Sequence, residues 1–184
     1  MQKWFKRNAD LQCSNVVNLP DGIGEIATPT TAFNVVYQLV HLYHHFFDEW
    51  IGMRQMVDYY FVVNDDGVLV IRDTLQKELK HLGLWKFAGT VMYVLHKTLG
   101  LPEERMIVPI DEKRGSLLLS EIMDGGNFGT HFTKYGRFIQ QGMAKKYFLK
   151  IWRNMHFVRY YPAEALSEPI FRTWHFFWRK KNKK

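Results

Sequence analysis

The chain has few of the features that mark secreted or membrane proteins. Its 184 residues include a single cysteine, Cys13, so no intramolecular disulfide can form and a disulfide-stabilised secreted scaffold is excluded. The N-terminus has no apolar segment of signal-peptide length. No run of about eighteen uncharged apolar residues occurs, which is the length that a transmembrane helix requires. These absences predict a soluble cytoplasmic protein.

Acidic residues are scarce in the last third of the chain. Residues 134–184 contain 13 Lys/Arg but only Glu164 and Glu168, a balance of +11, whereas residues 1–133 contain 12 Lys/Arg and 16 Asp/Glu, a balance of −4. The whole positive charge of +7 therefore comes from the last third. Such a concentration indicates a polyanionic partner or an anionic surface. The alternative is a solvated basic tail without a partner.

Apolar residues make up 47% of the chain and aromatic residues 16%, which is ample for one packed core. Their spacings of three and four predict amphipathic helices, because residues at that spacing share one helix face. The expected helices cover 31–63 (a pair interrupted at Gly52), 75–82, 84–99, 111–123, 140–160 and 169–181.

Residues 16–19 and 25–27 flank a turn-rich segment and predict a short β-hairpin. An isolated hairpin is marginal in water, so we expect it to pair with more sheet or to lie against the helices. The predicted fold is mainly α, a helical bundle with an N-terminal β-hairpin. Residues 1–29 form the hairpin and a linker, and residues 30–184 form a helical domain with a basic, aromatic end.

The polar side chains within residues 31–63 form the strongest candidate site. His41 and His45 lie four apart and share a helix face, as do Arg54 and Asp58. Apolar neighbours predict that Arg54 and Asp58 are half buried and face inward, with His41 or His45 within reach. Two histidines at this spacing can ligate a metal, but no third ligand is apparent. A structural role and a polar or phosphate contact are the favoured alternatives.

No other stretch carries a complete catalytic constellation. The glycine-rich segment 124–129 lacks the Lys and Ser/Thr of a phosphate loop and does not follow a strand, so it is expected to end a helix. Nothing around Cys13 indicates a low-pKa thiol. Asp65 and Asp66 lie in a predicted loop, 64–67, rather than on a strand, where carboxylates for phosphoryl transfer are expected.

Several motifs resemble, in order and spacing, those of a bacterial nucleotidyltransferase family that is largely uncharacterised. They are Phe33-Asn34-x-x-Tyr37-Gln38-Leu39-Val40-His41-x-Tyr43-x-His45, Gly52-Met53-Arg54-Gln55-Met56-x-Asp58-Tyr59-Tyr60, Leu84-Trp85-Lys86-Phe87-Ala88-Gly89, Asp111-Glu112-Lys113-Arg114-Gly115, Gly126-Asn127-Phe128-Gly129 and Trp174-His175-Phe176-Phe177-Trp178-Arg179. The resemblance covers nearly all of this chain. It corresponds only to the C-terminal half of such proteins.

In that family the front half resembles a polymerase-β-like core, whose carboxylates would hold Mg²⁺ and a nucleotide triphosphate. The Gly-Asp-x-Asp strand that carries them is absent here, so the resemblance implies a chain that is inactive alone. Its partner would be the missing N-terminal catalytic domain, in cis or in trans, and the hairpin would be the edge of the catalytic sheet.

The resemblance further implies that the helices close over the nucleotide site and present an acceptor substrate. His41, His45, Arg54 and Asp58 would line that cleft, with Arg54 as a phosphate contact. The rival interpretation is a non-catalytic helical binding module that uses its basic end on an acidic partner or a membrane surface. A truncated, inactive copy is the third.

Aromatic residues recur at three- and four-residue spacing near the C-terminus, at Phe171, Trp174, Phe177 and Trp178. Six Lys and Arg residues crowd the same segment. We expect these rings to dock on the helical core and to leave the cationic tail in solvent. The alternative is a helix that lies on an anionic membrane or polyanion.

Overall fold

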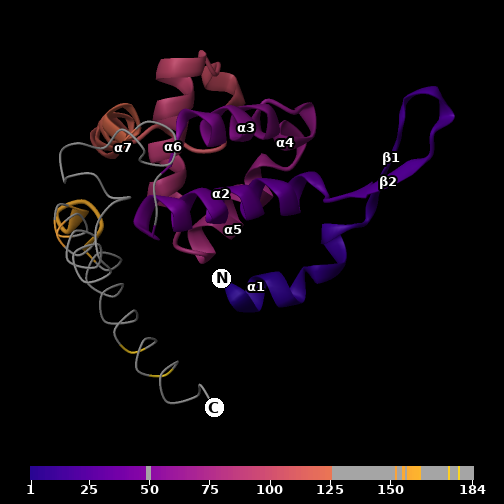
Figure 1. Cartoon of the computed structure of the whole chain (residues 1–184), viewed down its shortest axis with the longest axis horizontal. Coiled ribbons are helices and arrows are strands. Elements are labelled where there is room, and N and C mark those ends of the chain that lie inside the picture. The colour runs from indigo at the N-terminus through magenta and orange to yellow at the C-terminus, as the bar shows by residue number, and fades with distance from the viewer. Residues whose placement is uncertain are drawn as a thin grey trace, which may run out of the picture.

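The computed structural model describes residues 1–48, 51–125, 152, 155, 157–162, 174 and 178. Within those residues the chain forms seven α-helices and one two-stranded antiparallel hairpin (Figure 1), which confirms the predicted mainly helical class. None of the described helices is long and apolar enough to cross a membrane. The predicted helices 140–160 and 169–181 lie mostly outside the described residues; Trp152, Met155, Phe157, Trp174 and Trp178 are helical.

The hairpin consists of β1 (Asn15–Asn18) and β2 (Glu25–Thr28), as the sequence predicts. Val16 lies opposite Ala27 and Val17 opposite Ile26. The intervening turn places Asp21 at φ 59° and Gly22 at φ 68°. Aspartate and glycine are among the residues that accept this left-handed conformation most readily, so the turn is encoded locally.

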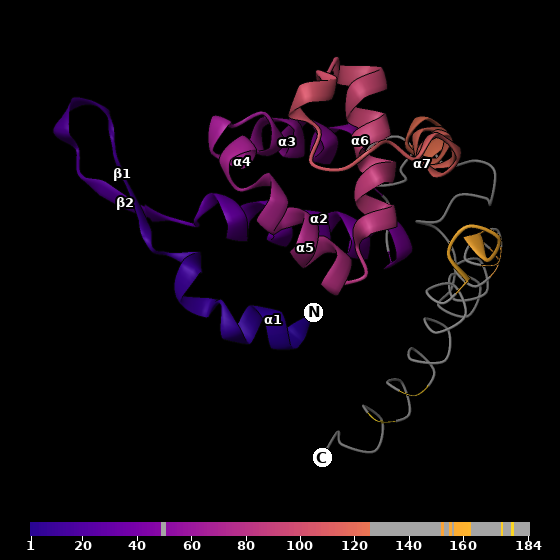
Figure 2. The same cartoon turned by 180° about the vertical axis from the view of Figure 1, so that it is seen from behind.

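Of the two expected positions of the hairpin, packing against the helices is wrong, and pairing with further sheet stays a prediction. It projects away from the helices in both views (Figures 1 and 2), and no third described strand pairs with it. Every residue of β1 is exposed. The backbone N–H of Thr30 donates to the carbonyl of Leu11, 3.0 Å away, and this bond closes the base of the hairpin. The strands consequently leave the helical body instead of lying along it.

A helix that the sequence analysis does not anticipate precedes the hairpin. It is α1 (Gln2–Arg7), followed by a short 3₁₀ turn, η1 (Ala9–Gln12). Trp4 is buried against Phe33, with ring centroids 5.8 Å apart. Its indole Nε1 donates to Glu78 Oε2 at 2.7 Å, so the α1 segment packs on the helical body.

The predicted helix pair is α2 (Thr31–Asp48) and α3 (Met53–Val63). Thr30 caps α2, because its hydroxyl accepts from the Phe33 N–H at 3.3 Å. Gly52 precedes α3, and its N–H donates to the Gln55 side chain at 2.9 Å. The sequence signals for both boundaries are confirmed.

Four further helices complete the body: α4 (Asp66–Val70), α5 (Arg72–His81), α6 (Trp85–Leu99) and α7 (Glu112–Gly125). Helix α4 corrects the prediction of a loop at 64–67, because the Asp65 carboxylate accepts from the Gly67 N–H at 2.8 Å and starts a helical turn. The breaks at Gly83 and Gly100, with φ of 73° and 69°, follow the sequence prediction. A 3₁₀ turn, η3 (Glu103–Arg105), lies between α6 and α7.

Helices α6 and α7 approach each other closely where glycine removes the side chain. A Cβ atom on Gly115 would lie 2.4 Å from the Tyr93 side chain. One on Gly89 would lie 2.8 Å from the Pro109 carbonyl oxygen. A larger residue at Gly115 would force α6 and α7 apart, and one at Gly89 would displace the segment before α7 that contains Pro109.

The centre of the body contains a group of rings that we call the aromatic cluster, namely Phe46, Phe47, Phe87, Phe157 and Tyr161. The Phe46 ring lies 4.8 Å from that of Phe157 and 5.9 Å from that of Tyr161, between centroids. The buried Tyr161 hydroxyl is 2.7 Å from Thr90 Oγ1. Residues 157–161, far along the sequence, therefore complete the core around α2 and α6.

Candidate functional site

His41 and His45 come together on the outer side of α2, as their spacing predicts. Their Nε2 atoms are 3.1 Å apart, and the rings meet edge-on at 79° with centroids 4.3 Å apart. His41 is exposed and His45 is half-buried. The Tyr37 ring lies parallel to His41 one turn earlier, with an interplanar angle of 8°. We call His41 and His45 the histidine pair.

Arg54 and Asp58 are both exposed, so the prediction that they are half buried and face inward is wrong. Helix α3 packs on the body through Met56, Tyr59 and Val63, which lie on the other side of the helix. The apolar neighbours in the sequence thus occupy one face of α3, and the charged residues occupy the opposite face. In the described part of the chain, neither Arg54 nor Asp58 forms a hydrogen bond or an ion pair.

The four predicted site residues therefore do not form one hydrogen-bonded cluster. Two are joined to each other, His41 and His45, whereas Arg54 and Asp58 stand as separate charges on α3. His41, Arg54 and Asp58 are exposed and His45 is half-buried, so the first three can contact a ligand or a second protein surface.

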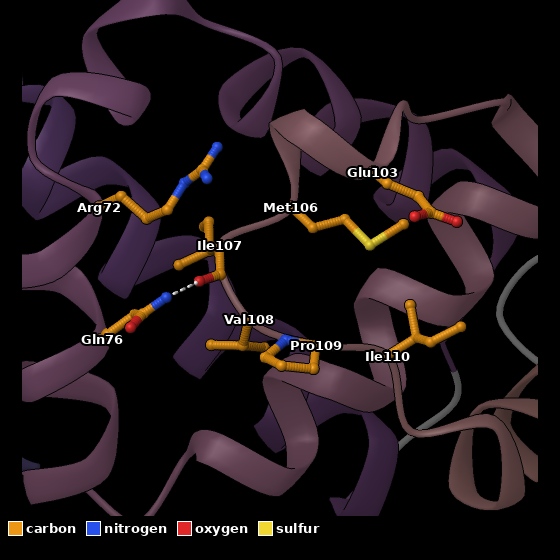
Figure 3. A pocket seen from close by; sticks show the side chains of 8 residues that line it. All are labelled: Arg72, Gln76, Glu103, Met106, Ile107, Val108, Pro109 and Ile110. Carbon is orange, nitrogen blue, oxygen red and sulfur yellow. Dashed lines mark hydrogen bonds between the residues drawn. The ribbon is translucent and has the colours of Figure 1, made fainter.

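A pocket that the sequence analysis misses lies between α5 and the segment before α7 (Figure 3). Its volume is about 520 Å³, and its walls are Arg72, Gln76, Glu103, Met106, Ile107, Val108, Pro109 and Ile110. Gln76 Nε2 donates to the Ile107 carbonyl at 2.8 Å and fixes this wall. Residues 106–110 have no helical or strand periodicity, so the sequence offers no signal for the pocket.

The pocket carries one basic side chain, Arg72, and one acidic side chain, Glu103, beside mostly apolar residues. Arg72 donates through Nη2 to the Glu104 carbonyl. Its buried Nε–H has no partner among the described residues. An arginine and a glutamate beside aliphatic side chains suit a small ligand that has polar groups on an apolar body.

Buried polar groups elsewhere in the body are structural. Arg114 pairs with Asp111 at 2.6 Å and donates through Nε to the Tyr160 carbonyl at 3.1 Å, which holds residues 157–161 against α7. Tyr59 is fully buried, and its hydroxyl has no partner in the described part of the chain. Burial raises the pKa of Tyr59 well above its ordinary value.

The Mg²⁺ implied by the family resemblance finds no suitable ligands among the described residues. They contain no group of three or more His, Cys, Asp or Glu side chains that could hold a metal ion. Asp65 caps α4, and Asp66 pairs with Arg105 at 2.5 Å. Both carboxylates thus have structural partners, and no catalytic step can be built on them.

The aromatic end contradicts part of the docking prediction. Trp174 and Trp178 are 57% and 49% exposed, and they stack on each other with centroids 6.4 Å apart. Phe171 and Phe177 lie outside the described residues. Trp152 and Met155, one turn apart in sequence, are also exposed.

The chain matches no family model, and neither a curated protein nor a solved structure is significantly similar to it. The nucleotidyltransferase resemblance consequently rests on the sequence motifs. Any function must be argued from those motifs together with the surfaces described above.

Proposed function

We propose that this chain is the helical region of a nucleotidyltransferase-like protein and that it works with a catalytic domain supplying the metal-binding carboxylates. The order and spacing of the sequence motifs favour this role. The structural observation that best supports it is the hairpin β1–β2, whose outer edges are open and whose strands stand clear of the helices.

An open hairpin is an incomplete structural unit. Its outer backbone N–H and C=O groups have no strand of the described residues beside them, and Val16, Val17 and Ile26 expose 59%, 49% and 49% of their surface. The strands contain neither Lys nor Pro, the residues that commonly protect sheet edges. A neighbouring catalytic sheet would pair those edges and bury these side chains.

The exposed charges on α2 and α3 would then face the nucleotide. Arg54 offers a planar guanidinium that can contact two phosphate oxygens at once. His41 and His45 lie on an adjacent helix, outside the core. Helices α2 and α3 would act as a cover that orients the triphosphate and an acceptor, while the chemistry takes place on the partner domain.

The experiment measures binding and turnover separately. Radiolabelled triphosphates with Mg²⁺ should give no transfer or hydrolysis with this chain alone, because its described residues contain no metal-binding carboxylate set. Calorimetry should detect weak triphosphate binding that falls several-fold in Arg54→Ala. Lys77→Ala, an exposed cation on α5, is the matched control.

Two outcomes would contradict the proposal. One is turnover above background that disappears when a residue of this chain is mutated. The other is triphosphate binding that is absent, or is equally weakened by Lys77→Ala, since Arg54 would then have no specific role.

A second candidate function rests on the exposed tryptophans. Trp174 and Trp178 form a stacked aromatic pair within a segment whose sequence balance from residue 134 onward is +11. Tryptophan favours the membrane–water interface, and each Lys or Arg near an anionic leaflet adds about 1 kcal/mol of attraction. In this candidate the chain is a non-catalytic module that lies on an anionic lipid surface.

Liposome co-sedimentation tests the second candidate. Binding to vesicles with phosphatidylserine should weaken steeply as salt rises, because exposed charges are screened within about 10 Å at 0.1 M. The double change Trp174→Ala and Trp178→Ala removes rings but no charge and should reduce binding. Phe61→Ala, an exposed ring on α3, serves as the control. Equal binding to neutral vesicles would overturn this candidate.

A further inference from the structure

We propose that His41 and His45 form a binding site for a late first-row divalent metal ion such as Zn²⁺ or Cu²⁺. The site goes beyond the proposed function and does not depend on it. The observation that carries it is the separation of 3.1 Å between the two Nε2 atoms.

This separation is the one that a shared metal requires. Zn–N(His) bonds are about 2.0–2.1 Å long, so two imidazoles at an angle of about 90–110° around one ion have nitrogens roughly 2.9–3.4 Å apart. The observed 3.1 Å lies within that interval. The two Nε2 atoms now share a hydrogen bond and already lie at that separation, so no backbone movement is needed to bring them together.

The scaffold holds this geometry. Helix α2 has 18 residues, and its inner face is fixed by buried Val35, Leu39 and Phe46. Tyr37 stacks against His41 and restricts its ring. A pre-positioned pair avoids part of the side-chain entropy that a metal would otherwise have to overcome.

The ligand chemistry identifies the class of ion. Neutral imidazole suits Zn²⁺, Ni²⁺ and Cu²⁺, whereas Mg²⁺ prefers oxygen ligands. Each histidine would donate its Nε2 lone pair and keep its single proton on Nδ1, so the Nε2 proton now shared between the rings moves to Nδ1. Two protein ligands leave the remaining coordination positions to water or to a donor atom of a bound molecule.

Titration of the full chain with Zn²⁺ alone and with Cu²⁺ alone tests the proposal. We expect one ion per chain at this site, tighter for Cu²⁺ than for Zn²⁺, with no comparable effect of Mg²⁺. His41→Gln and His45→Gln should each weaken this binding at least tenfold. His44→Gln is the matched control, because His44 is exposed on the same helix but off the shared face.

Electron paramagnetic resonance of the Cu²⁺-loaded chain provides a second readout. Its spectrum should show splitting from two imidazole nitrogens, reduced in either Gln variant and unchanged in His44→Gln. Circular dichroism confirms that each variant is folded. Equal metal affinity in His45→Gln, or an equal loss in His44→Gln, would overturn the proposal. Neither outcome bears on triphosphate binding by Arg54, so the two proposals fail separately.

Discussion

The aromatic cluster and the hairpin are both rich in apolar side chains, yet they stand at opposite extremes of burial. Phe46 and Phe157 are fully buried, whereas Val16 is 59% exposed. The cluster gathers rings from α2, α6 and residues 157–161, so each ring meets others from distant parts of the chain. The hairpin has two strands and no covering layer among the described elements. Apolar side chains are thus buried only where another segment of the chain covers them, and an apolar composition alone does not guarantee such a cover.

Removing a ring from the aromatic cluster should have the largest effect on the free energy of unfolding. Phe46→Ala should reduce the free energy of unfolding by about 3–5 kcal/mol, because it removes a fully buried ring and leaves a cavity. Chemical denaturation followed by circular dichroism measures the change. Phe61→Ala, an exposed ring on α3, is the control and should cost little. A loss below about 1 kcal/mol would mean that the cluster is loosely packed.

Removing a polar atom from the buried region should instead raise the free energy of unfolding. Tyr59→Phe removes a buried hydroxyl that lacks a described partner, so we expect a gain of about 1 kcal/mol. Burial raises the folded-state pKa of Tyr59, so above pH 10 the unfolded tyrosine ionises while the folded one stays neutral, and the natural chain loses stability as pH rises further.

The advantage of Tyr59→Phe over the natural chain should consequently grow above pH 10, by about 1.4 kcal/mol per pH unit. Denaturation at pH 8, 10 and 11 measures it. A loss of stability on Tyr59→Phe at pH 8 would show that the hydroxyl has a partner in solution.

A substitution on the hairpin should have the smallest effect on the free energy of unfolding. Val17→Thr keeps β-branching at a half-exposed strand position, so we expect a change within about 0.5 kcal/mol. Thermal denaturation measures it, with Val91→Thr on buried α6 as the contrasting change. A cost above about 1 kcal/mol for Val17→Thr would reveal that another layer covers the hairpin in solution.

Local signals in the sequence predict local structure well. Thr30, Gly52, Gly83 and Gly100 mark helix boundaries, and the turn around Asp21 marks the hairpin, because each acts through its own backbone or its immediate neighbours. Helix α1 is not predicted from the sequence. Its single buried residue, Trp4, is buried by Phe33 and bonded to Glu78, which both lie far away in the sequence.

The candidate site is harder to predict for the same reason. Spacing alone brings His41 and His45 together, because both lie on one helix. The orientation of Arg54 and Asp58 depends on which face of α3 packs on the body, which neighbours in sequence do not settle. The pocket around Arg72 joins α5 to the irregular segment 106–110 and requires tertiary structure to be recognised.

The position of Phe157 and Tyr161, far along the sequence from α2, has a consequence for folding during synthesis. During synthesis helices α2 and α6 emerge before residues 157–161, which supply the rings that contact Phe46 and Phe47. Until then the nascent chain presents an uncovered aromatic surface, the kind of surface that chaperones recognise and that promotes aggregation. A chain truncated before Phe157 would keep that surface exposed, so we expect such a truncated chain to aggregate more readily than the full chain.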